Sequence, residues 1–248
     1  MSARESPDAA REMPASVPPV LRDVGVVIVA GGSGTRVGGD ELKQFRWVAG
    51  KPMLLHSVQT FMARPDVAMV VVVLPQQYAG DPPPWLFQCD VDRLLVSLGG
   101  RTRSESVANG LDDLPDEAEI VLVHDAARPL VGATTIDRVV AAVRDGKSAV
   151  AALPVVDTLK EVDQDGRIVR TISRDPLWRA QTPQGFPRRV IVDAHRRARK
   201  ERVSATDDAA LLERLGIPVH VVLGSERALK VTEVGDFARV DALFPTDE

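Results

Sequence analysis

Six short runs rich in Val, Ile, Leu and Ala recur along the chain, with segments between them that are long enough for helices. Most of the runs are apolar throughout rather than alternating, which is typical of strands covered on both faces of a parallel sheet. This rhythm predicts an α/β fold, a Rossmann-like, three-layer, mostly parallel sheet with helices on both faces. The six predicted strands span residues 24–30, 68–74, 93–98, 119–124, 148–153 and 218–223.

The segments between these runs repeat apolar residues at helical spacing. Ile136, Val139, Val140 and Val143 fall at i, i+3, i+4 and i+7, which predicts an amphipathic helix. Similar stripes predict helices around residues 55–62, 107–114 and 212–215. In open sheets of this kind, ligands bind in the crevice at the carboxyl ends of the strands.

Residues 155–186 break this rhythm. They contain two short strand-like runs about Asp165-Gly166, a dipeptide typical of hairpin turns. A β-hairpin that projects from the sheet explains the segment better than another strand–helix unit. We therefore expect one domain over residues 24–248, with a hairpin arm at about 155–180, behind a disordered tail at 1–23 that shows no periodicity.

Composition excludes several classes of partner. The net charge of −4 over 248 residues gives no electrostatic reason to expect nucleic acid, and the basic run at 195–202 is predicted to be the solvated face of a helix. The single cysteine, Cys89, cannot form an intrachain disulfide and suits a reducing compartment. No apolar run approaches the roughly 20 residues that a membrane span needs. We expect a cytoplasmic protein that binds neither nucleic acid nor membrane.

A glycine-rich stretch, VIVAGGSGTRVGG, follows the first predicted strand at residues 27–39. It lacks the Lys-Ser/Thr pair of a P-loop. A dinucleotide fingerprint would start at Gly32 and Gly34, but Val37 stands at its third glycine and no acidic residue follows at the required distance. Two interpretations stay open: a loop that wraps a nucleoside triphosphate, with cations at Arg36 and Lys43, or a turn that needs glycine for backbone reasons alone.

Two further motifs favour a polyphosphate site. In VHDAARP, Asp125 comes directly after an apolar strand, where its carboxylate could bind Mg²⁺ together with substrate phosphates or could simply cap the next segment. In GGRTRSES, a second glycine turn precedes Arg103 and Ser106 at the expected start of a helix, a natural anion site. The four histidines show no metal-binding spacing, and no nucleophile pattern stands out.

These motifs also occur in a known family. AGGSGTR, LKQF, GGRTRSES, VHDAARP, DTLK, ISRDPLW, QTPQGF, TDDA and LKVT stand in an order and spacing that resembles 2-C-methyl-D-erythritol 4-phosphate cytidylyltransferases, over residues 25 to about 243. Val29 and Leu42 stand where family members often carry proline. The related cytidylyltransferases that act on ribitol 5-phosphate, or on another sugar or alcohol phosphate, share some motifs and form the alternative. DTLK, SRDPLW and TDDA favour the methylerythritol enzyme.

The resemblance implies a homodimeric enzyme that transfers CMP from CTP to 2-C-methyl-D-erythritol 4-phosphate with Mg²⁺ as cofactor. The arm at 155–180 would reach into a second subunit, and Arg128 would support the Asp125 turn. The residue roles that it implies are catalysis by Arg36 and Lys43; metal binding by Asp125; CTP binding by Ala30, Gly31, Gly32, Gly34, Gly100, Arg103, Ser106 and Ala126; and alcohol phosphate binding by Thr158, Arg174, Thr206, Asp207 and Lys230.

Overall fold

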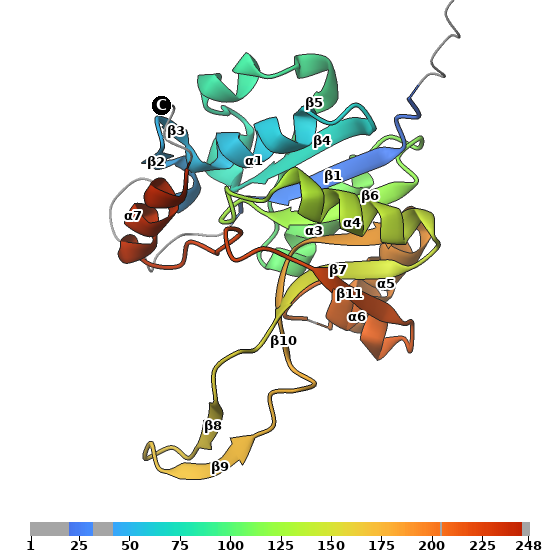
Figure 1. Ribbon diagram of the computed structural model, residues 1–248. Coiled ribbons are helices and arrows are strands. Elements are labelled where there is room, and N and C mark those ends of the chain that lie inside the picture. The colour runs from blue at the N-terminus through green and yellow to red at the C-terminus, as the bar shows by residue number, and fades with distance from the viewer. Residues whose placement is uncertain (1–19, 32–41, 204, 245–248) are drawn as a thin grey trace, which may run out of the picture.

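The computed structural model of the protein describes residues 20–31, 42–203 and 205–244. Its central element is a seven-stranded sheet in the order β11-β7-β10-β6-β1-β4-β5 (Figure 1). All neighbouring pairs are parallel except those of β10, which runs antiparallel to β6 and β7. The mostly parallel sheet is confirmed, with strands β1 (Val24–Val29), β4 (Val67–Leu74), β5 (Leu94–Leu98), β6 (Ile120–Asp125), β7 (Ser148–Pro154), β10 (Trp178–Pro187) and β11 (Val219–Leu223).

Helices cover both faces of this sheet (Figure 1). Successive strand residues point to opposite faces, so Val26 and Ile28 of β1 pack into one core while Val27 packs into the other. Helices α1 (Met53–Met62) and α4 (Ala133–Arg144) close the first core. Helices α3 (Arg103–Asp112), α5 (Arg188–Glu201) and α6 (Ala209–Arg214) close the second. The predicted three-layer arrangement is thus confirmed.

The projecting hairpin is also confirmed, but it is shorter than its predicted segment. Strands β8 (Leu159–Val162) and β9 (Ile168–Ile172) pair antiparallel and extend away from the sheet (Figure 1). Gly166 makes the turn with a φ of +80°, a conformation that favours glycine. The predicted arm at about 155–180 ends slightly earlier in the structure, because residues from Trp178 onward belong to β10, which returns to the middle of the sheet. The sequence of β10 contains polar Gln and Thr residues, so it forms no apolar run of the kind that predicts a buried strand.

Smaller elements surround the sheet. Strands β2 (Trp47–Val48) and β3 (Lys51–Pro52) form a short antiparallel pair beside α7 (Val234–Leu243). The remaining elements are η1 (Lys43–Phe45), α2 (Gln76–Ala79), η2 (Pro84–Gln88) and η3 (Val91–Arg93). Most of the predicted tail, residues 1–19, lies outside the described residues.

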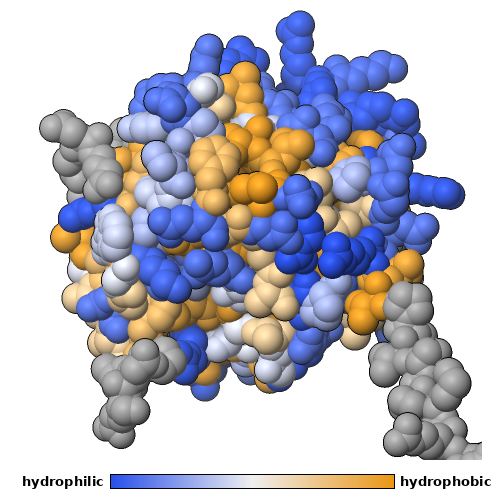
Figure 2. All heavy atoms as spheres, turned by 90° about the horizontal axis from the view of Figure 1, so that it is seen from above, coloured by the Kyte–Doolittle hydropathy of each residue, from blue (hydrophilic) through white to orange (hydrophobic). Residues whose placement is uncertain are grey.

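Hydrophilic residues surround smaller hydrophobic groups on the face seen in Figure 2. Within the described ranges, no helix combines the length and the apolar character needed to cross a membrane.

Two helical glycines provide a test of the packing between helix and sheet. A Cβ atom on Gly110 of α3 would lie 2.6 Å from Val27 Cγ1 and 2.9 Å from Val73 Cγ2. We expect Gly110→Ala to lower the free energy of unfolding, because overpacking costs about 1–3 kcal/mol and the gain in helix propensity is at most about 1 kcal/mol. Gly235 of α7 faces open space, so Gly235→Ala should raise the free energy of unfolding slightly. Urea denaturation measures both, and a stabilised Gly110→Ala protein would contradict the packing argument.

Candidate active site

The end of β1 and a glycine turn after β5 meet at the carboxyl edge of the sheet. Gly31 follows β1, and a Cβ atom on it would lie 3.2 Å from Ser106 Oγ. The turn after β5 contains Gly100, whose N–H donates to the same Ser106 Oγ at 3.0 Å. The Ser106 hydroxyl in turn donates to the Thr102 carbonyl at 3.0 Å. The structure therefore brings together three residues to which the family resemblance assigns CTP binding.

The turn after β5 can form only because Gly100 has no side chain. A Cβ atom at this position would lie 2.3 Å from Glu105 Cβ, closer than atoms can approach. The turn leads directly into α3, where the Thr102 hydroxyl accepts the Glu105 N–H at 3.1 Å as an N-cap. The start of α3 therefore lies at the crevice, where its N-terminal dipole favours an anion.

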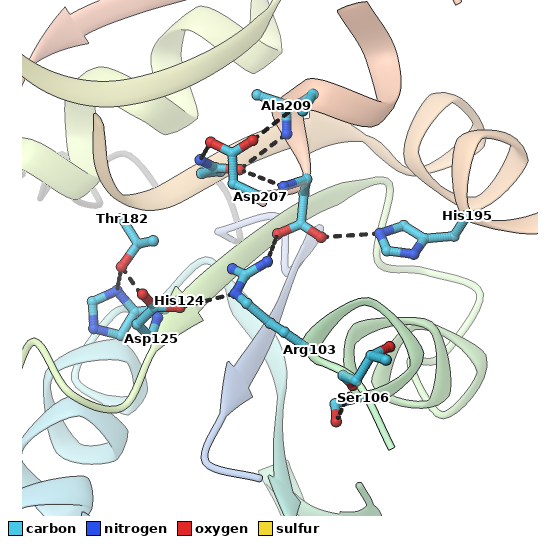
Figure 3. A network of polar contacts seen from close by, with 12 residues as sticks. Arg103, Ser106, His124, Asp125, Thr182, His195, Asp207 and Ala209 are labelled. Atoms are coloured by element: carbon cyan, nitrogen blue, oxygen red, sulfur yellow. Dashed lines mark hydrogen bonds and ion pairs between the residues drawn. The ribbon is translucent and has the colours of Figure 1, made fainter. Parts of the chain in front are cut away.

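Asp125, the last residue of β6, is the buried anionic centre of this edge (Figure 3). Its Oδ1 accepts from Arg103 Nε at 3.2 Å and its Oδ2 from Lys230 Nζ at 2.7 Å. Burial acts to raise the pKa of Asp125, but the charges of Arg103 and Lys230 outweigh burial and hold the pKa well below its usual range. The carboxylate is thus ionised at neutral pH, with a cation on each oxygen.

Arg103 contacts a second carboxylate as well. Its Nη1 donates to Asp208 Oδ2 at 2.7 Å, and Asp208 Oδ1 lies 3.0 Å from His195 Nε2 (Figure 3). Burial acts to lower the pKa of Arg103, but the charges of Asp208 and Asp125 raise it above its usual value. The sequence assigns Arg103 to CTP. The structure gives its guanidinium two protein carboxylates as partners, and the nucleotide contact stays a prediction.

A second chain of hydrogen bonds fixes the backbone of Asp125. The Asp125 N–H donates to Thr182 Oγ1 at 3.1 Å, and that hydroxyl lies 2.9 Å from His124 Nδ1. His124 Nε2 lies 3.2 Å from the Arg128 carbonyl, which can only accept. Burial lowers the pKa of His124 to about 4, so the ring is neutral at pH 7. Its single proton is therefore on Nε2, and Nδ1 accepts from Thr182.

Two predicted lysines converge on one loop after β11. Lys230 pairs with Asp125, and the next carbonyl, that of Val231, accepts from Lys43 Nζ at 2.7 Å. The Val231 N–H donates to the Ala127 carbonyl at 2.8 Å, which holds the loop beside β6. Gln44 Nε2 donates to the Ala30 carbonyl at the end of β1. These contacts place Lys43 and Lys230 at the same edge as Asp125.

Arg128 supports the Asp125 turn through its backbone, as predicted. Its N–H lies 3.0 Å from the Asp125 carbonyl. Its guanidinium donates instead to the carbonyls of Ala228, at 2.7 Å, and Ala180, at 3.3 Å. The side chain therefore joins β10 to the loop that carries Lys230.

The residues predicted for the alcohol phosphate are not gathered in one place within a single chain. Thr158 and Arg174 lie exposed on the arm, directly before β8 and shortly after β9, and the Arg174 guanidinium donates to the Val156 carbonyl. Thr206 is exposed just before α6. Asp207 accepts from Gln184 Nε2 at 2.8 Å and from the Ala210 N–H at 3.0 Å, so its carboxylate caps α6.

The structure also places the remaining predicted residues. The backbone N–H groups of Ala30 and Ala126, both buried, donate to Val73 and Val29 in the sheet. Gly32, Gly34 and Arg36 lie outside the described residues. The roles assigned to all these residues stay predictions.

Four residues in this network escape sequence reasoning: Thr182, Gln184, His195 and Asp208. Gln184 Oε1 accepts the N–H groups of Asp208 and Ala209, both at 3.1 Å. The only available signal is an unusual concentration of polar residues in QTPQ and TDDA, because each partner is distant in the sequence. His195 is the exception to the solvated face predicted for the basic run, since it is buried against Asp208.

The residues present fit a Mg²⁺ ion that is shared with a nucleotide. Among the described residues, no group of three or more His, Cys, Asp or Glu side chains could hold a metal alone. Mg²⁺ commonly uses one or two carboxylates and takes its other ligands from phosphates and water. Asp125 offers one ionised carboxylate at the end of β6, near the N-terminus of α3. Such a site is suited to a metal–triphosphate complex.

Sequence comparison agrees with this chemistry. The family model of 2-C-methyl-D-erythritol 4-phosphate cytidylyltransferase (IspD) matches residues 24–245. A relative of that name from Salinibacter ruber is 44% identical over 223 residues, which are 89% of this chain and 92% of the relative. One from Streptomyces coelicolor is 44% identical over 231 residues, 88% of this chain and 83% of the relative.

Solved structures lead to the same family. The crystal structure of 2-C-methyl-D-erythritol 4-phosphate cytidylyltransferase from Thermus thermophilus is 35% identical, with a TM-score of 0.74 over 89% of this chain and 98% of that one. The 4-diphosphocytidyl-2C-methyl-D-erythritol synthase of Anaerococcus prevotii is 26% identical, with a TM-score of 0.78 over 89% of this chain and 95% of that one. The likeness therefore extends over nearly the whole chain in sequence and in fold.

The buried neutral His124 gives the fold a specific pH dependence. Its pKa is about 4 in the native protein, against 6.5 for an exposed histidine. Between these values the unfolded chain binds the additional proton. The free energy of unfolding should therefore fall as the pH is lowered from 6.5 to 4, by roughly 1.4 kcal/mol per pH unit from this residue.

Urea denaturation at several pH values, for the wild type and His124→Asn, tests this expectation. The difference between the two proteins should shrink as the pH falls through this window and should be constant above it. Parallel pH profiles would show that His124 titrates normally in the native state.

Proposed function

The chain belongs to the 2-C-methyl-D-erythritol 4-phosphate cytidylyltransferase family, and we propose that it transfers CMP from CTP to 2-C-methyl-D-erythritol 4-phosphate and releases pyrophosphate. One observation carries the proposal: the ionised Asp125 carboxylate lies between Arg103 and Lys230 at the carboxyl edge of the sheet, near the N-terminus of α3. This arrangement supports the binding of a metal–triphosphate complex.

The chemistry requires no activated protein nucleophile. An oxygen of the alcohol phosphate, already anionic at neutral pH, forms a bond to the α-phosphorus of CTP. The bond between that phosphorus and the bridging oxygen to the β-phosphate breaks, and its electron pair leaves with pyrophosphate. No general base is needed, in keeping with a neutral His124 whose two ring nitrogens are both engaged. Catalysis then depends on positioning and on stabilising negative charge.

The chain's own cations would supply that stabilisation. Lys43 Nζ, on the Val231 carbonyl, and Lys230 Nζ, on Asp125, lie at the edge where the phosphates would bind. Arg36, from the glycine-rich stretch, would add a third cation. Mg²⁺ bound to Asp125 and the phosphates would withdraw electron density from the reacting phosphorus. Gly31, Gly100 and Ser106 would hold the nucleoside end, beside the N-terminus of α3.

The arm supports a homodimer. It extends from the domain (Figure 1) and carries Thr158 directly before β8 and Arg174 shortly after β9. Apolar side chains along the arm and its base are exposed in the single chain: Val156, Val162, Ile168, Val169 and Trp178. Docking of the arm on a second subunit would bury them and would carry Thr158 and Arg174 to the partner's Asp125 site. The alcohol phosphate would then bind between two subunits.

A substrate panel tests the reaction. With Mg²⁺ present, CTP, UTP, ATP and GTP are each offered with methylerythritol phosphate or with ribitol 5-phosphate, and pyrophosphate release is measured. We expect release with CTP and methylerythritol phosphate well above every other pair. Faster release with ribitol 5-phosphate would favour the alternative substrate, and no release with CTP would overturn the proposal.

Mixed dimers test whether the site is shared. Lys43→Ala should lower kcat by about 10²-fold, the scale for one lost transition-state donor, and Arg174→Ala should raise the KM for the alcohol phosphate. If Arg174 acts on the partner's site, each heterodimer of the two variants has one intact site. An equal mixture then recovers about a quarter of the wild-type activity, because half the dimers are mixed and half of their sites are intact.

Lys43→Ala mixed with Lys230→Ala is the control. These two residues lie at one edge of the same chain, so every site in that mixture lacks one of them. Equal recovery in both mixtures, or none in either, would show that Arg174 does not act across the interface.

A further inference from the structure

Arg103 is held between two carboxylates that have different surroundings. Its Nε reaches Asp125, which ends β6 at the crevice, and its Nη1 reaches Asp208, immediately before α6 (Figure 3). The Asp208 side chain is almost fully buried, with 1% exposed. Asp125 belongs to the proposed metal and nucleotide site. Asp208 has no place in the reaction derived above, and its buried charge therefore calls for an explanation.

The contacts of Asp208 hold it firmly in one orientation. Its Oδ1 is 3.0 Å from His195 Nε2 of α5, and its backbone N–H donates to Gln184 Oε1 of β10 at 3.1 Å. Burial acts to raise the pKa of Asp208, but the hydrogen bond from His195 and the charge of Arg103 lower it below the usual value. An ionised carboxylate fixed by two elements of the fold thus anchors one end of the guanidinium.

We propose that Asp208 is a positioning residue for the reaction: through Arg103, it sets how strongly the Asp125 carboxylate is bound by protein and how readily it accepts a divalent cation. The inference rests on the proposed function, since it takes Asp125 as the metal ligand. His195 supports Asp208 from α5.

The direction of the effect follows from electrostatics. With Asp208 present, the guanidinium is shared, and its charge is partly neutralised before a metal–triphosphate complex enters. Without that carboxylate, Arg103 would pair with Asp125 alone and compete more strongly with the cation for it. The uncompensated guanidinium would also repel the cation. Both effects weaken the binding of the cation to Asp125.

A double-mutant cycle on metal binding tests the proposal. Mn²⁺ is titrated into the full-length protein in the presence of CTP and without any alcohol phosphate, and free Mn²⁺ is measured by electron paramagnetic resonance. We expect Asp208→Asn to weaken Mn²⁺ binding about tenfold, the scale found when an outer partner of a metal ligand is lost. In the Arg103→Gln background, the same substitution should change Mn²⁺ binding less than about twofold, because Asp208 can no longer act on Asp125 through Arg103.

Asp66→Asn is the matched control. Asp66 is also buried and pairs with two arginines, Arg64 and Arg144, but it lies before β4, at the opposite edge of the sheet. It should lower stability without changing Mn²⁺ affinity. A purely structural role for Asp208 would give the same result, with a lower thermal midpoint and unchanged affinity for the folded protein, and would overturn the proposal.

Equal losses in the wild-type and Arg103→Gln backgrounds would overturn it too, since Asp208 would then act independently of Arg103. If Asp208→Asn does not fold, His195→Gln replaces it in the same double-mutant cycle. We then expect His195→Gln to weaken Mn²⁺ binding in the wild-type background but not in the Arg103→Gln background. The readout needs no turnover. A chain that binds Mn²⁺ with CTP but fails the substrate panel therefore refutes the reaction while the cycle still decides the role of Asp208.

Discussion

The buried carboxylate of Asp125 imposes the main physical constraint on this protein. An ionised group of this kind costs several kcal/mol to bury unless cations and hydrogen bonds compensate for the lost water. The compensation comes from Arg103 at the start of α3, the helix directly before β6, and from Lys230 in the loop after β11, 105 residues from Asp125. Both must be in place for the carboxylate to stay charged. The charge balance of one residue therefore links the two halves of the sheet.

Side chains of strand β10 hold the segments around Asp125 in place by hydrogen bonds. This strand is the antiparallel strand of the central sheet, and its side chains are polar where its neighbours are apolar. Thr182 holds the backbone of Asp125, Gln184 holds the turn that carries Asp208, and Gln181 Nε2 donates to the Ser225 carbonyl while its Oε1 accepts the Ser225 N–H. The polar residues that make β10 a poor strand by composition are thus the ones that fix the site.

This explains which parts of the protein can be predicted from sequence. Apolar runs indicate the parallel strands and place Asp125 at a strand end, and the glycines that follow two of the strands indicate the edge where Gly31 and Gly100 both lie beside Ser106. β10 is missed because its pattern is polar. Asp208 and His195 are missed because the first contacts Arg103 across 105 residues of sequence and the second is embedded in a basic run. The spacing of residues in the sequence predicts which side chains are local neighbours. Ion pairs between distant segments form only in the completed fold, so spacing does not predict them.

The arm is continuous with the strands that hold the site. It leaves the sheet from β7 and returns through β10, and these strands pair at the base of the arm, with Trp178 beside Pro154 and Arg179 beside Leu153. Directly beyond this base, the Ala180 carbonyl accepts from Arg128, whose other contact is Ala228 in the Lys230 loop. The Arg128 guanidinium and the Gln181–Ser225 pair therefore connect the base of the arm to the loop that carries Lys230, so the arm and the site depend on the same strand.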